Sequence, residues 1–369
     1  MNKVLPGLII FLGLVVSQVS AQTGGGSFAS TVPLVRPDSA QWQAGAGFDF
    51  ALGKKKNLKL RQSVSGISCL SGSQAQQLCL LVFDEGVQAR YATLTDGQVQ
   101  PEREVLQFPG LTGELDAEGA ATDGRYVYIT GSHSAKRSDC ASNPDSRYVI
   151  RAPLNAQRTR VDVAAAVSTG QLWTLLLDHP ELRTLVGENK CLGTEPAPKA
   201  PRMRGQYGLN IEGLAVRDGQ LHFGLRGPVP GGQALVFSVP AERLFATGVA
   251  NAAPTPIQLA RLDLGAQRGV RDMVAVQDGI LLLAGPDDDE RNKDAGWVVF
   301  WWDGRTGQGA TGLRPLARLD LSQVKLRDCD SHPKPEAMTV LSANSTSYRL
   351  LVLSDGLCDG GALSFTVPR

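Results

Sequence analysis

Five stretches of the chain share one repeated pattern, and this repeat constrains the fold more than any other feature. In each copy a polar or acidic residue precedes small and apolar residues, and an Asp-Gly or Ser-Gly turn usually follows. Each turn then leads into a second apolar run. The copies begin VSGISCL (64–70), LDAEGAATDG (115–124), LNIEGLAVRDG (209–219), GVRDMVAVQDG (269–279) and PKPEAMTVLS (333–342).

Short apolar runs separated by tight turns are typical of β-hairpins. A third run follows in each copy, and a fourth precedes the next copy, as in LARLDL at 259–264 and again at 316–321. Four strands per unit, repeated along the chain, predict an all-β fold of the β-propeller type. Five repeats are detected, so we expect five or six blades, with a sandwich or a barrel as the alternative folds.

The spacing of the repeats locates one insertion. Ser65 to Glu118 is 53 residues, Glu212 to Asp272 is 60 and Asp272 to Glu336 is 64, but Glu118 to Glu212 is 94. The excess lies near 156–207, where residues 171–186 carry leucines close to helical spacing and Pro180 interrupts them. We expect a helical insertion there, with a poorly matching sixth blade as the alternative.

The ends of the chain predict how the ring closes. The last repeat lacks a fourth run, and LKLRQS (58–63) has the fourth-run pattern without a repeat of its own. We therefore expect this N-terminal strand to complete the last blade and to cover its exposed edge.

The N-terminus has the features of a secretory signal. Lys3 precedes an apolar run that is too short to span a membrane, and small residues up to Ala21 form a cleavage site. We expect a signal peptide at 1–21, a flexible or extended leader at 22–56 and a single propeller domain at 57–369. This organisation predicts an exported protein, periplasmic or secreted, with no membrane span once the signal is removed.

The cysteines fit an oxidising compartment. Six are present, an even number, and no C-x-x-C or C-x-x-H pair favours zinc. Pairing of sequence neighbours is our prediction among 15 possible patterns. It joins Cys69 to Cys79 across a hairpin, Cys140 to Cys191 around the insertion, and Cys329 to Cys358 around the last repeat.

The charge balance narrows the partners. The chain has 37 basic and 36 acidic residues, a net charge of +1, which gives no electrostatic basis for binding nucleic acid. We expect a monomer that takes a small-molecule ligand or a protein partner whose identity the sequence does not reveal.

Several motifs resemble a known family along almost the whole mature chain. They are VFDEG (82–86), ELDAEGAATDGRYVYITGSHS (114–134), GLNIEGLAVRDG (208–219), RGVRDMVAV (268–276), KPEAM (334–338) and VLSDGLCDGG (352–361). These motifs resemble exported proteins of the domain of unknown function 3616 family, which implies no activity. The Glu-Gly strand start is also similar to the esterase-like phytase family, and that similarity implies a propeller and phosphoester or ester chemistry.

In a propeller, the innermost strands line a central channel, so the repeat openings converge at its mouth. This convergence gathers candidate residues that are far apart in the sequence. For ligand binding they are Asp116, Asn210, Arg226, Arg271, Asp272, Lys334 and Glu336. The candidate catalytic residues are Glu118, Glu212 and His133, and the candidate metal ligands are Glu118, Glu212, Asp272 and Glu336. Loops after the second runs add Asp84, Glu85, Asp287 and Asp355.

Two function classes follow from this set. Several carboxylates around one axis suit Ca²⁺, which takes 6–8 oxygen ligands, and the arginines and lysine suit a small anion. The first hypothesis is a non-catalytic protein that binds a small anionic ligand, a metal or a partner. The alternative is a Ca²⁺-assisted phosphoesterase or esterase, in which the metal polarises the substrate and activates water. A third interpretation is a partner-binding protein that uses the blade edges or the insertion at 156–207. In that case most of these polar residues have structural roles.

Overall fold

The computed structural model describes residue 1 and most of the chain from residue 32 onward. The described ranges are 32–48, 54–73, 76–85, 89–111, 113–136, 139–187, 190, 192–197, 200–206, 208–246, 257–265, 267–288, 290–307 and 312–369. The expected signal peptide lies outside the described residues, and so does Cys191, the expected partner of Cys140. Residues 32–369 form one compact unit.

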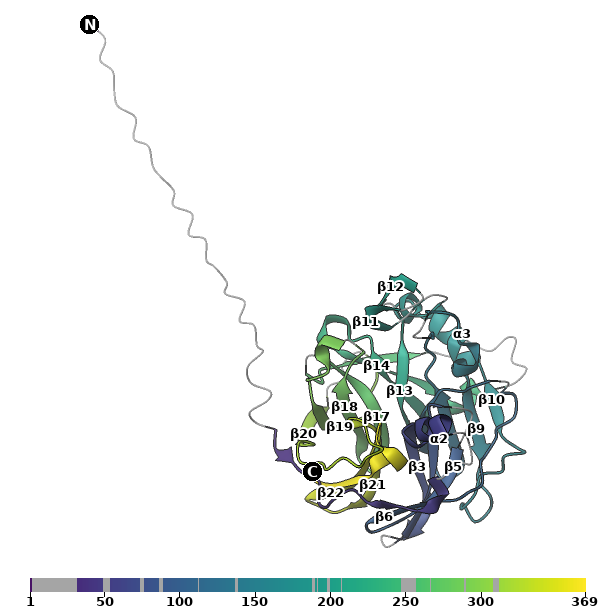
Figure 1. Ribbon diagram of the computed structural model, residues 1–369. Helices are drawn as coiled ribbons and strands as arrows, with labels where there is room; N and C mark the ends of the chain where they lie inside the picture. The colour runs from purple at the N-terminus through teal and green to yellow at the C-terminus, as the bar shows by residue number, and fades with distance from the viewer. Residues whose placement is uncertain are drawn as a thin grey trace. The chain divides into compact units, whose positions relative to one another are not determined.

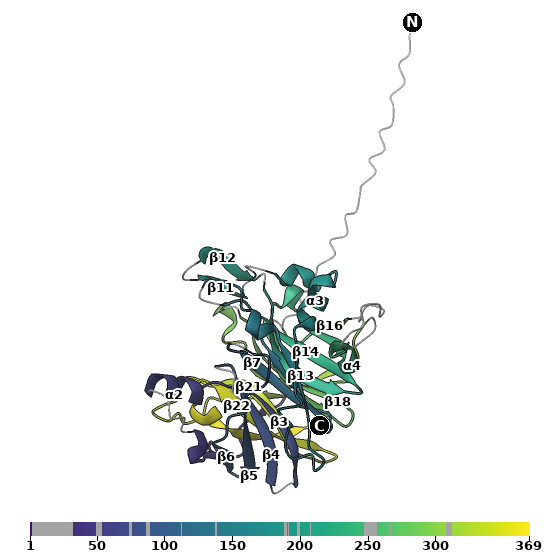
Figure 2. The same cartoon turned by 90° about the vertical axis from the view of Figure 1, so that its right-hand side faces the viewer.

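Five inner strands form a closed ring, which confirms the predicted propeller. Each contacts the next one along the chain, and the last contacts the first (Figures 1 and 2). They are β3 (Val64–Ser73), β7 (Ala117–Thr122), β13 (Asn210–Arg217), β17 (Arg268–Val276) and β21 (Lys334–Ala343). The blade count is therefore five.

Each blade continues outward as an antiparallel meander. Blades 1 to 4 have four such strands and blade 5 has three. Blade 1 adds β4 (Gln76–Phe83), β5 (Ala89–Thr95) and β6 (Gln98–Pro101), and blade 2 adds β8 (Tyr126–Gly131), β9 (Val149–Pro153) and β10 (Val167–Thr169). Blade 3 adds β14 (Gln220–Gly227), β15 (Ala234–Pro240) and β16 (Gln258–Leu262). Blade 4 adds β18 (Gly279–Pro286), β19 (Trp297–Trp302) and β20 (Leu313–Leu319), and blade 5 adds β22 (Ser347–Asp355) and β23 (Leu363–Pro368).

An N-terminal segment covers the outer edges, but not the one that the sequence predicted. Residues 58–63 belong mostly to helix α2 (Lys54–Arg61), whose Lys, Leu and Arg residues favour a helix. Strand β1 (Leu34–Val35) instead pairs in parallel with β20, and β2 (Gln43–Ala44) pairs in parallel with β6. Between them, the Asp38 and Trp42 amides donate hydrogen bonds to β23 and the adjoining residue, at Ser364 and Ala362. The expected strand at 58–63 is therefore wrong. Blade 5 keeps three strands, and the N-terminal segment covers its outer edge by backbone hydrogen bonds from Asp38 and Trp42.

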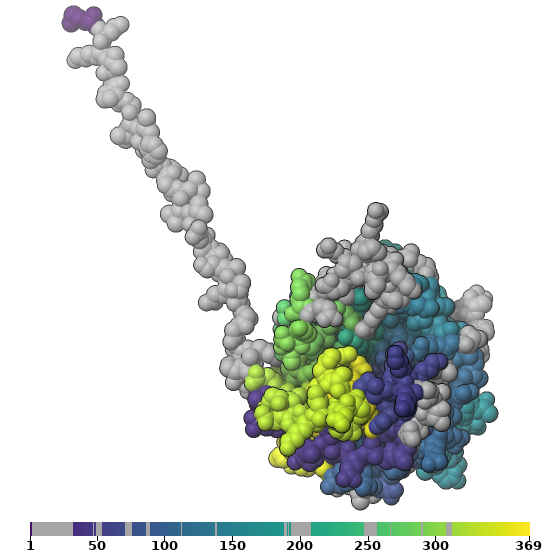
Figure 3. Space-filling model, viewed as in Figure 1, coloured from purple at the N-terminus to yellow at the C-terminus, as the bar shows by residue number. Residues whose placement is uncertain are grey.

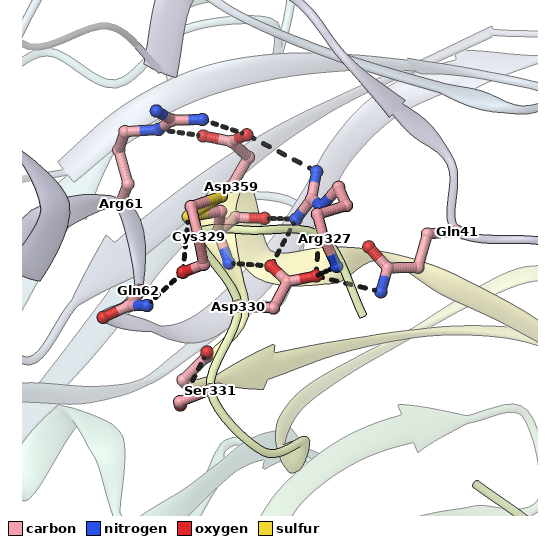
Figure 4. Close-up of a disulfide and its surroundings, with 10 residues drawn as sticks. Gln41, Arg61, Gln62, Arg327, Cys329, Asp330, Ser331 and Asp359 are labelled. Atoms are coloured by element: carbon pink, nitrogen blue, oxygen red, sulfur yellow. Dashed lines mark hydrogen bonds and ion pairs between the residues drawn. A yellow bond between two sulfur atoms is a disulfide. The ribbon is translucent and has the colours of Figure 1, made fainter. Parts of the chain in front are cut away.

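Side chains fasten both ends of the domain together around a disulfide (Figure 4). Cys329 and Cys358 are bonded as predicted, and Cys358 begins the 3-10 turn η6 (Cys358–Gly361). Arg61 of α2 makes a bidentate ion pair with Asp359, with N–O distances of 2.6 and 2.7 Å. The buried carboxylate of Asp330 accepts hydrogen bonds from the Cys358 amide and from Arg327. In the surface view, α2 lies beside the C-terminal residues (Figure 3).

The other two predicted disulfides have different outcomes. Cys69 and Cys79 face each other across the β3–β4 hairpin and are bonded, as expected. Cys140 is disulfide-bonded, but its expected partner lies outside the described residues.

The insertion after blade 2 begins with a helix, as predicted. Helix α3 (Gln171–Asp178) ends before Pro180, and the 3-10 turn η3 (Leu182–Leu185) follows. Leu172 and Leu176 of α3 and Leu182 of η3 are buried and join the core between blades 2 and 3. The insertion ends in a two-stranded hairpin of β11 (Leu192–Ala197) and β12 (Ala200–Gln206), so the alternative of a sixth blade is wrong.

The remaining helical elements are short connections. They are η1 (Ala46–Phe48), η2 (Pro144–Arg147), η4 (Pro230–Gly232), α4 (Ala241–Leu244) and η5 (Glu290–Asn292). Among the described residues, no helix has the length and apolar composition required to cross a membrane.

Candidate functional site

All five inner strands carry a register shift at the same level, and the residues at these shifts form one ring. Each shift leaves one residue without a partner across the hairpin, a β-bulge that re-aims its side chain. We call these residues the bulge ring: Ser65, Glu118, Glu212, Arg271 and Glu336. All five are buried. The repeated opening of the sequence motif therefore encodes a ring of polar side chains.

The glycine that follows the ring residue in three blades has a packing reason. A Cβ on Gly119 would lie 2.8 Å from the Cβ of Leu214 and 3.0 Å from the carbonyl oxygen of Glu212. A Cβ on Gly66 would lie 3.1 Å from the carbonyl oxygen of Glu118. The Glu-Gly pair thus places an acid in the ring and lets the next inner strand approach closely.

Blade 4 corrects the predicted alignment of the repeats. The spacing of the repeats aligned Asp272 with Glu118 and Glu212, but the bulge puts Arg271 at that position. Asp272 instead accepts hydrogen bonds from the amides of Met273 and Met338, at 2.7 and 2.6 Å. Its carboxylate therefore joins blade 4 to blade 5 and does not line the channel mouth.

Hydrogen bonds and ion pairs link most members of the bulge ring. Arg271 makes ion pairs with Glu212, at 2.8 Å, and with Glu336. The Ser65 hydroxyl donates to Glu118 at 2.7 Å and is 3.4 Å from Glu336. Contacts within the ring therefore join all blades in one network, and Arg271 is its single cation.

A polar cavity of about 440 Å³ lies at the mouth of the channel, next to the ring. Acidic side chains dominate its wall, because eight carboxylates line it against four cationic groups. The acids are Asp84, Glu85, Glu114, Asp116, Glu118, Glu212, Glu336 and Asp355, and the bases are Lys59, Lys136, Arg226 and Lys334. The predicted convergence of strand starts and second-strand ends at one mouth is seen here.

Three of the four cationic groups in the cavity already bind acids. Arg226 contacts Glu212 at 2.8 Å and Asp288 at 2.9 Å. Lys334 contacts Asp355 at 3.0 Å, and Lys59 contacts Glu85. Arg226 and Lys334 were predicted to bind an anion, but their positive charges are already paired with acids of this chain.

Asp84 and Glu118 have no such lysine or arginine partner among the described residues. Glu118 accepts a hydrogen bond from Ser65, and the Oδ1 atom of Asp84 is buried without a hydrogen-bond donor among the described residues. Burial raises the pKa of Glu118 well above its usual range, and the nearby charge of Glu212 adds to this. Burial and then the charge of Asp355 likewise raise the pKa of Asp84. Burial also raises the pKa of Glu336, to about 7, although Arg271 opposes the shift.

The remaining predicted residues lie around these acids. Asp116 accepts a hydrogen bond from Ser132 and has a positive φ of 54°. Asn210 donates to Glu212 at 3.2 Å and is buried. Asp287 accepts a hydrogen bond from Asn292 and does not line the cavity.

His133 is not where the sequence predicted it. It was expected on the loop surface, but it is 2% exposed and does not line the cavity. Its Nδ1 atom is 3.0 Å from the carbonyl oxygen of Gly131, and burial lowers its pKa to about 4. The imidazole is therefore neutral at pH 7 and has a structural environment.

Sequence reasoning missed four contributors to the site: Ser65, Asp288, Lys59 and Lys136, the last of which lines the cavity. Ser65 was set aside because it lacks an acid, and Asp288 lies in an acidic run that is typical of a solvated loop. Lys59 was placed in an edge strand. Only the shared repeat position of Ser65 was a usable signal, because the contacts of Asp288 and Lys59 depend on the fold.

Comparisons with known proteins give a family and distant structural likenesses. The family model described as "Protein of unknown function (DUF3616)" matches residues 80–166 and 204–360. No curated protein matches the chain.

Similar solved structures include two exo-β-1,3-galactanases. The one from Clostridium thermocellum shares 10% identity, with 90% of this chain and 62% of that chain covered and a TM-score of 0.43. The one from Phanerochaete chrysosporium shares 8% identity, with 83% and 60% covered and a TM-score of 0.40. An endo-arabinanase from Bacillus licheniformis shares 10% identity, with 83% and 94% covered and a TM-score of 0.37.

Proposed function

Because the chain belongs to the DUF3616 family, whose description assigns no activity, we propose a function from the site itself: the channel mouth binds a small cationic ligand. A concave cavity with convergent polar groups and perturbed pKa values is the default place for a binding site. The volume of about 440 Å³ falls within the usual range for small-molecule sites.

The surplus of carboxylates in the cavity is the observation that carries this proposal. Eight acids face four bases, and three of those bases are already paired with acids. Burial raises the pKa values of Asp84 and Glu118, and repulsion between neighbouring carboxylates adds to the rise. A bound cation relieves this repulsion and replaces the protons that the acids would otherwise hold.

The same ion pairs redirect the expectation of an anionic ligand. Arg226, Arg271 and Lys334 were the candidate anion-binding residues, and each one contacts a carboxylate of this chain. An incoming phosphate or carboxylate would have to displace those acids and would meet the remaining ones. Ca²⁺, the metal considered from the sequence, carries the favoured sign of charge.

Ester hydrolysis is the second candidate, and the state of Glu118 favours it. Burial raises the pKa of Glu118, so this carboxyl holds its proton to higher pH than an ordinary glutamic acid, as a general acid requires. In this version, a bound metal ion polarises an ester or phosphoester and activates water, and Glu118 protonates the leaving group.

We also propose that the protein works outside the cytoplasm, as a monomer. Disulfides persist in oxidising compartments, and Cys69–Cys79 and Cys329–Cys358 are bonded here. The signal peptide expected at 1–21 would direct the export.

Thermal unfolding of the protein with added salts tests the binding proposal. Ca²⁺ and 1,4-diaminobutane are the cationic probes, inorganic phosphate is the anionic probe, and Glu118→Gln is the variant. We expect at least one cation to raise the midpoint of the wild type and to raise it less in the variant. Stabilisation by phosphate alone would overturn the proposal, and phosphate release from a phosphomonoester with Ca²⁺ would favour the hydrolase.

A further inference from the structure

Two pairs of acids in the cavity wall differ in whether a lysine of this chain binds them. We call them the outer acids and the inner acids. The outer acids Glu85 and Asp355 each hold the ammonium group of a lysine from this chain, Lys59 and Lys334. The inner acids Asp84 and Glu118 line the same cavity without an ammonium or guanidinium partner among the described residues. The chain therefore shows how this cavity holds primary ammonium groups, and it leaves the inner position without one.

The spacing of the acids does not suit a ready-made metal site. Ca²⁺ binds its oxygens at 2.3–2.6 Å, so any two ligand oxygens lie within about 5 Å of each other. Within the described ranges, the one group of three possible ligands whose atoms lie within 4.8 Å of one another is Cys329, Asp330 and Cys358. The two cysteines of that group form a disulfide, and the group does not line the cavity. Among the described residues, no three acids of the cavity wall therefore form a preformed site for one ion.

The chemistry of the wall also selects among organic cations. No aromatic residue is among the described residues that line the cavity. Quaternary ammonium groups are held mainly by aromatic faces, because they have no N–H to donate. The buried Oδ1 of Asp84, in contrast, needs a hydrogen-bond donor. An ammonium group with N–H bonds donates to a carboxylate of this wall and neutralises its charge in one contact.

We propose that the ligand is a small organic primary amine, whose ammonium group binds between Asp84 and Glu118. This inference rests on the proposed cation site and names its ligand class. The cavity volume accommodates a molecule of several carbon atoms beyond the ammonium group. Glu114 and Asp116, further acids of the same cavity wall, then face any second amino group that the ligand carries.

Calorimetric titration of the full chain at pH 8 tests the ligand class with matched probes. The probes are methylammonium, 1,4-diaminobutane, tetramethylammonium and Ca²⁺. We expect 1,4-diaminobutane to bind at least tenfold more tightly than tetramethylammonium or Ca²⁺, with methylammonium in between. The Asp84→Asn and Glu118→Gln variants each weaken diamine binding at least tenfold, whereas Asp218→Asn, at an exposed turn, leaves it unchanged.

The outcomes separate this inference from the proposal on which it rests. Binding of Ca²⁺ without binding of amines, reduced in the same variants, would overturn the amine and leave the cation site standing. If neither Ca²⁺ nor any amine binds, both the amine inference and the proposed cation site are overturned. Equal binding of tetramethylammonium and methylammonium, or diamine binding unchanged in both folded variants, would also overturn the inference. Two variants are used so that misfolding of one does not decide the result.

Discussion

Replacing Arg271 with methionine tests the role of the bulge ring as a connection between blades. Arg271 is 1% exposed and makes ion pairs with Glu212 and Glu336, on the neighbouring inner strands. Methionine keeps much of the apolar stem and removes the charge. Both carboxylates then lose their shared cation, although Glu212 keeps Arg226. We therefore expect Glu336 to bear most of the effect.

The magnitude follows from the burial of these groups. Removing one partner of a buried ion pair costs about 3–5 kcal/mol of the free energy of unfolding, because an unpaired charge stays buried. We expect a loss in this range at pH 8, where Glu336 is ionised in the wild type because its pKa is about 7.

The pH dependence gives a second, independent sign. The folded-state pKa of Glu336 lies above its ordinary value of 4.5, so its contribution to stability is present below pH 4.5 and is lost as pH rises to about 7. Without Arg271 this pKa rises further, and Glu336 keeps its proton at higher pH. Stability of the variant then continues to fall above pH 7, by about 1.4 kcal/mol per pH unit. The difference from the wild type is therefore smaller at pH 5 than at pH 8.

Urea unfolding followed by tryptophan fluorescence at pH 5 and pH 8 measures both quantities. The double variant Arg271→Met, Glu336→Gln should recover part of the lost free energy of unfolding at pH 8, because it removes the carboxyl group that is buried without a cation. Arg305→Met is the matched control, since Arg305 is largely exposed and should show no measurable change. A loss below about 1 kcal/mol at pH 8, or one equal at both pH values, would refute the reasoning about the ring.

Three further predictions concern packing, the disulfide and pH. Gly119→Ala should destabilise the fold by about 1–3 kcal/mol in urea unfolding, because its methyl group would overlap the next inner strand; Gly170→Ala, whose nearest neighbour is 4.0 Å away, should have little effect. Replacing Cys329 and Cys358 by serine should cost about 2–4 kcal/mol under non-reducing conditions, and equal midpoints for variant and wild type would contradict this. Affinity for a cation should increase as pH rises from 5 to 8, because Glu336 loses its proton near pH 7, and calorimetry showing the opposite trend would count against the site.

Local patterns were enough to predict the blades, because each hairpin is fixed by its own turn and apolar runs. The copies at 115–124 and 209–219 show this, since both fold as the inner hairpins that the sequence predicts. The disulfide from Cys69 to Cys79 follows from the same hairpin register. Helix α3 follows from its leucine spacing and from Pro180.

Features that depend on contacts between distant segments were not predictable. Residues 58–63 alternate like a strand, but most of them belong to helix α2, whose Arg61 makes an ion pair with the distant Asp359. The bulge that exchanges Arg271 for Asp272 is invisible in the sequence, because both are polar residues at a strand start. The sequence also identified acids and bases at one mouth without showing that most of the bases are paired.

A crystal structure of the protein soaked with 1,4-diaminobutane at pH 8 tests the central claim most directly. The account predicts electron density for the diamine in the channel mouth, with one ammonium group within hydrogen-bond distance of Asp84 and Glu118. Density for an anion on Arg226 or Lys334, or a cavity that holds only water at saturating diamine, would contradict it.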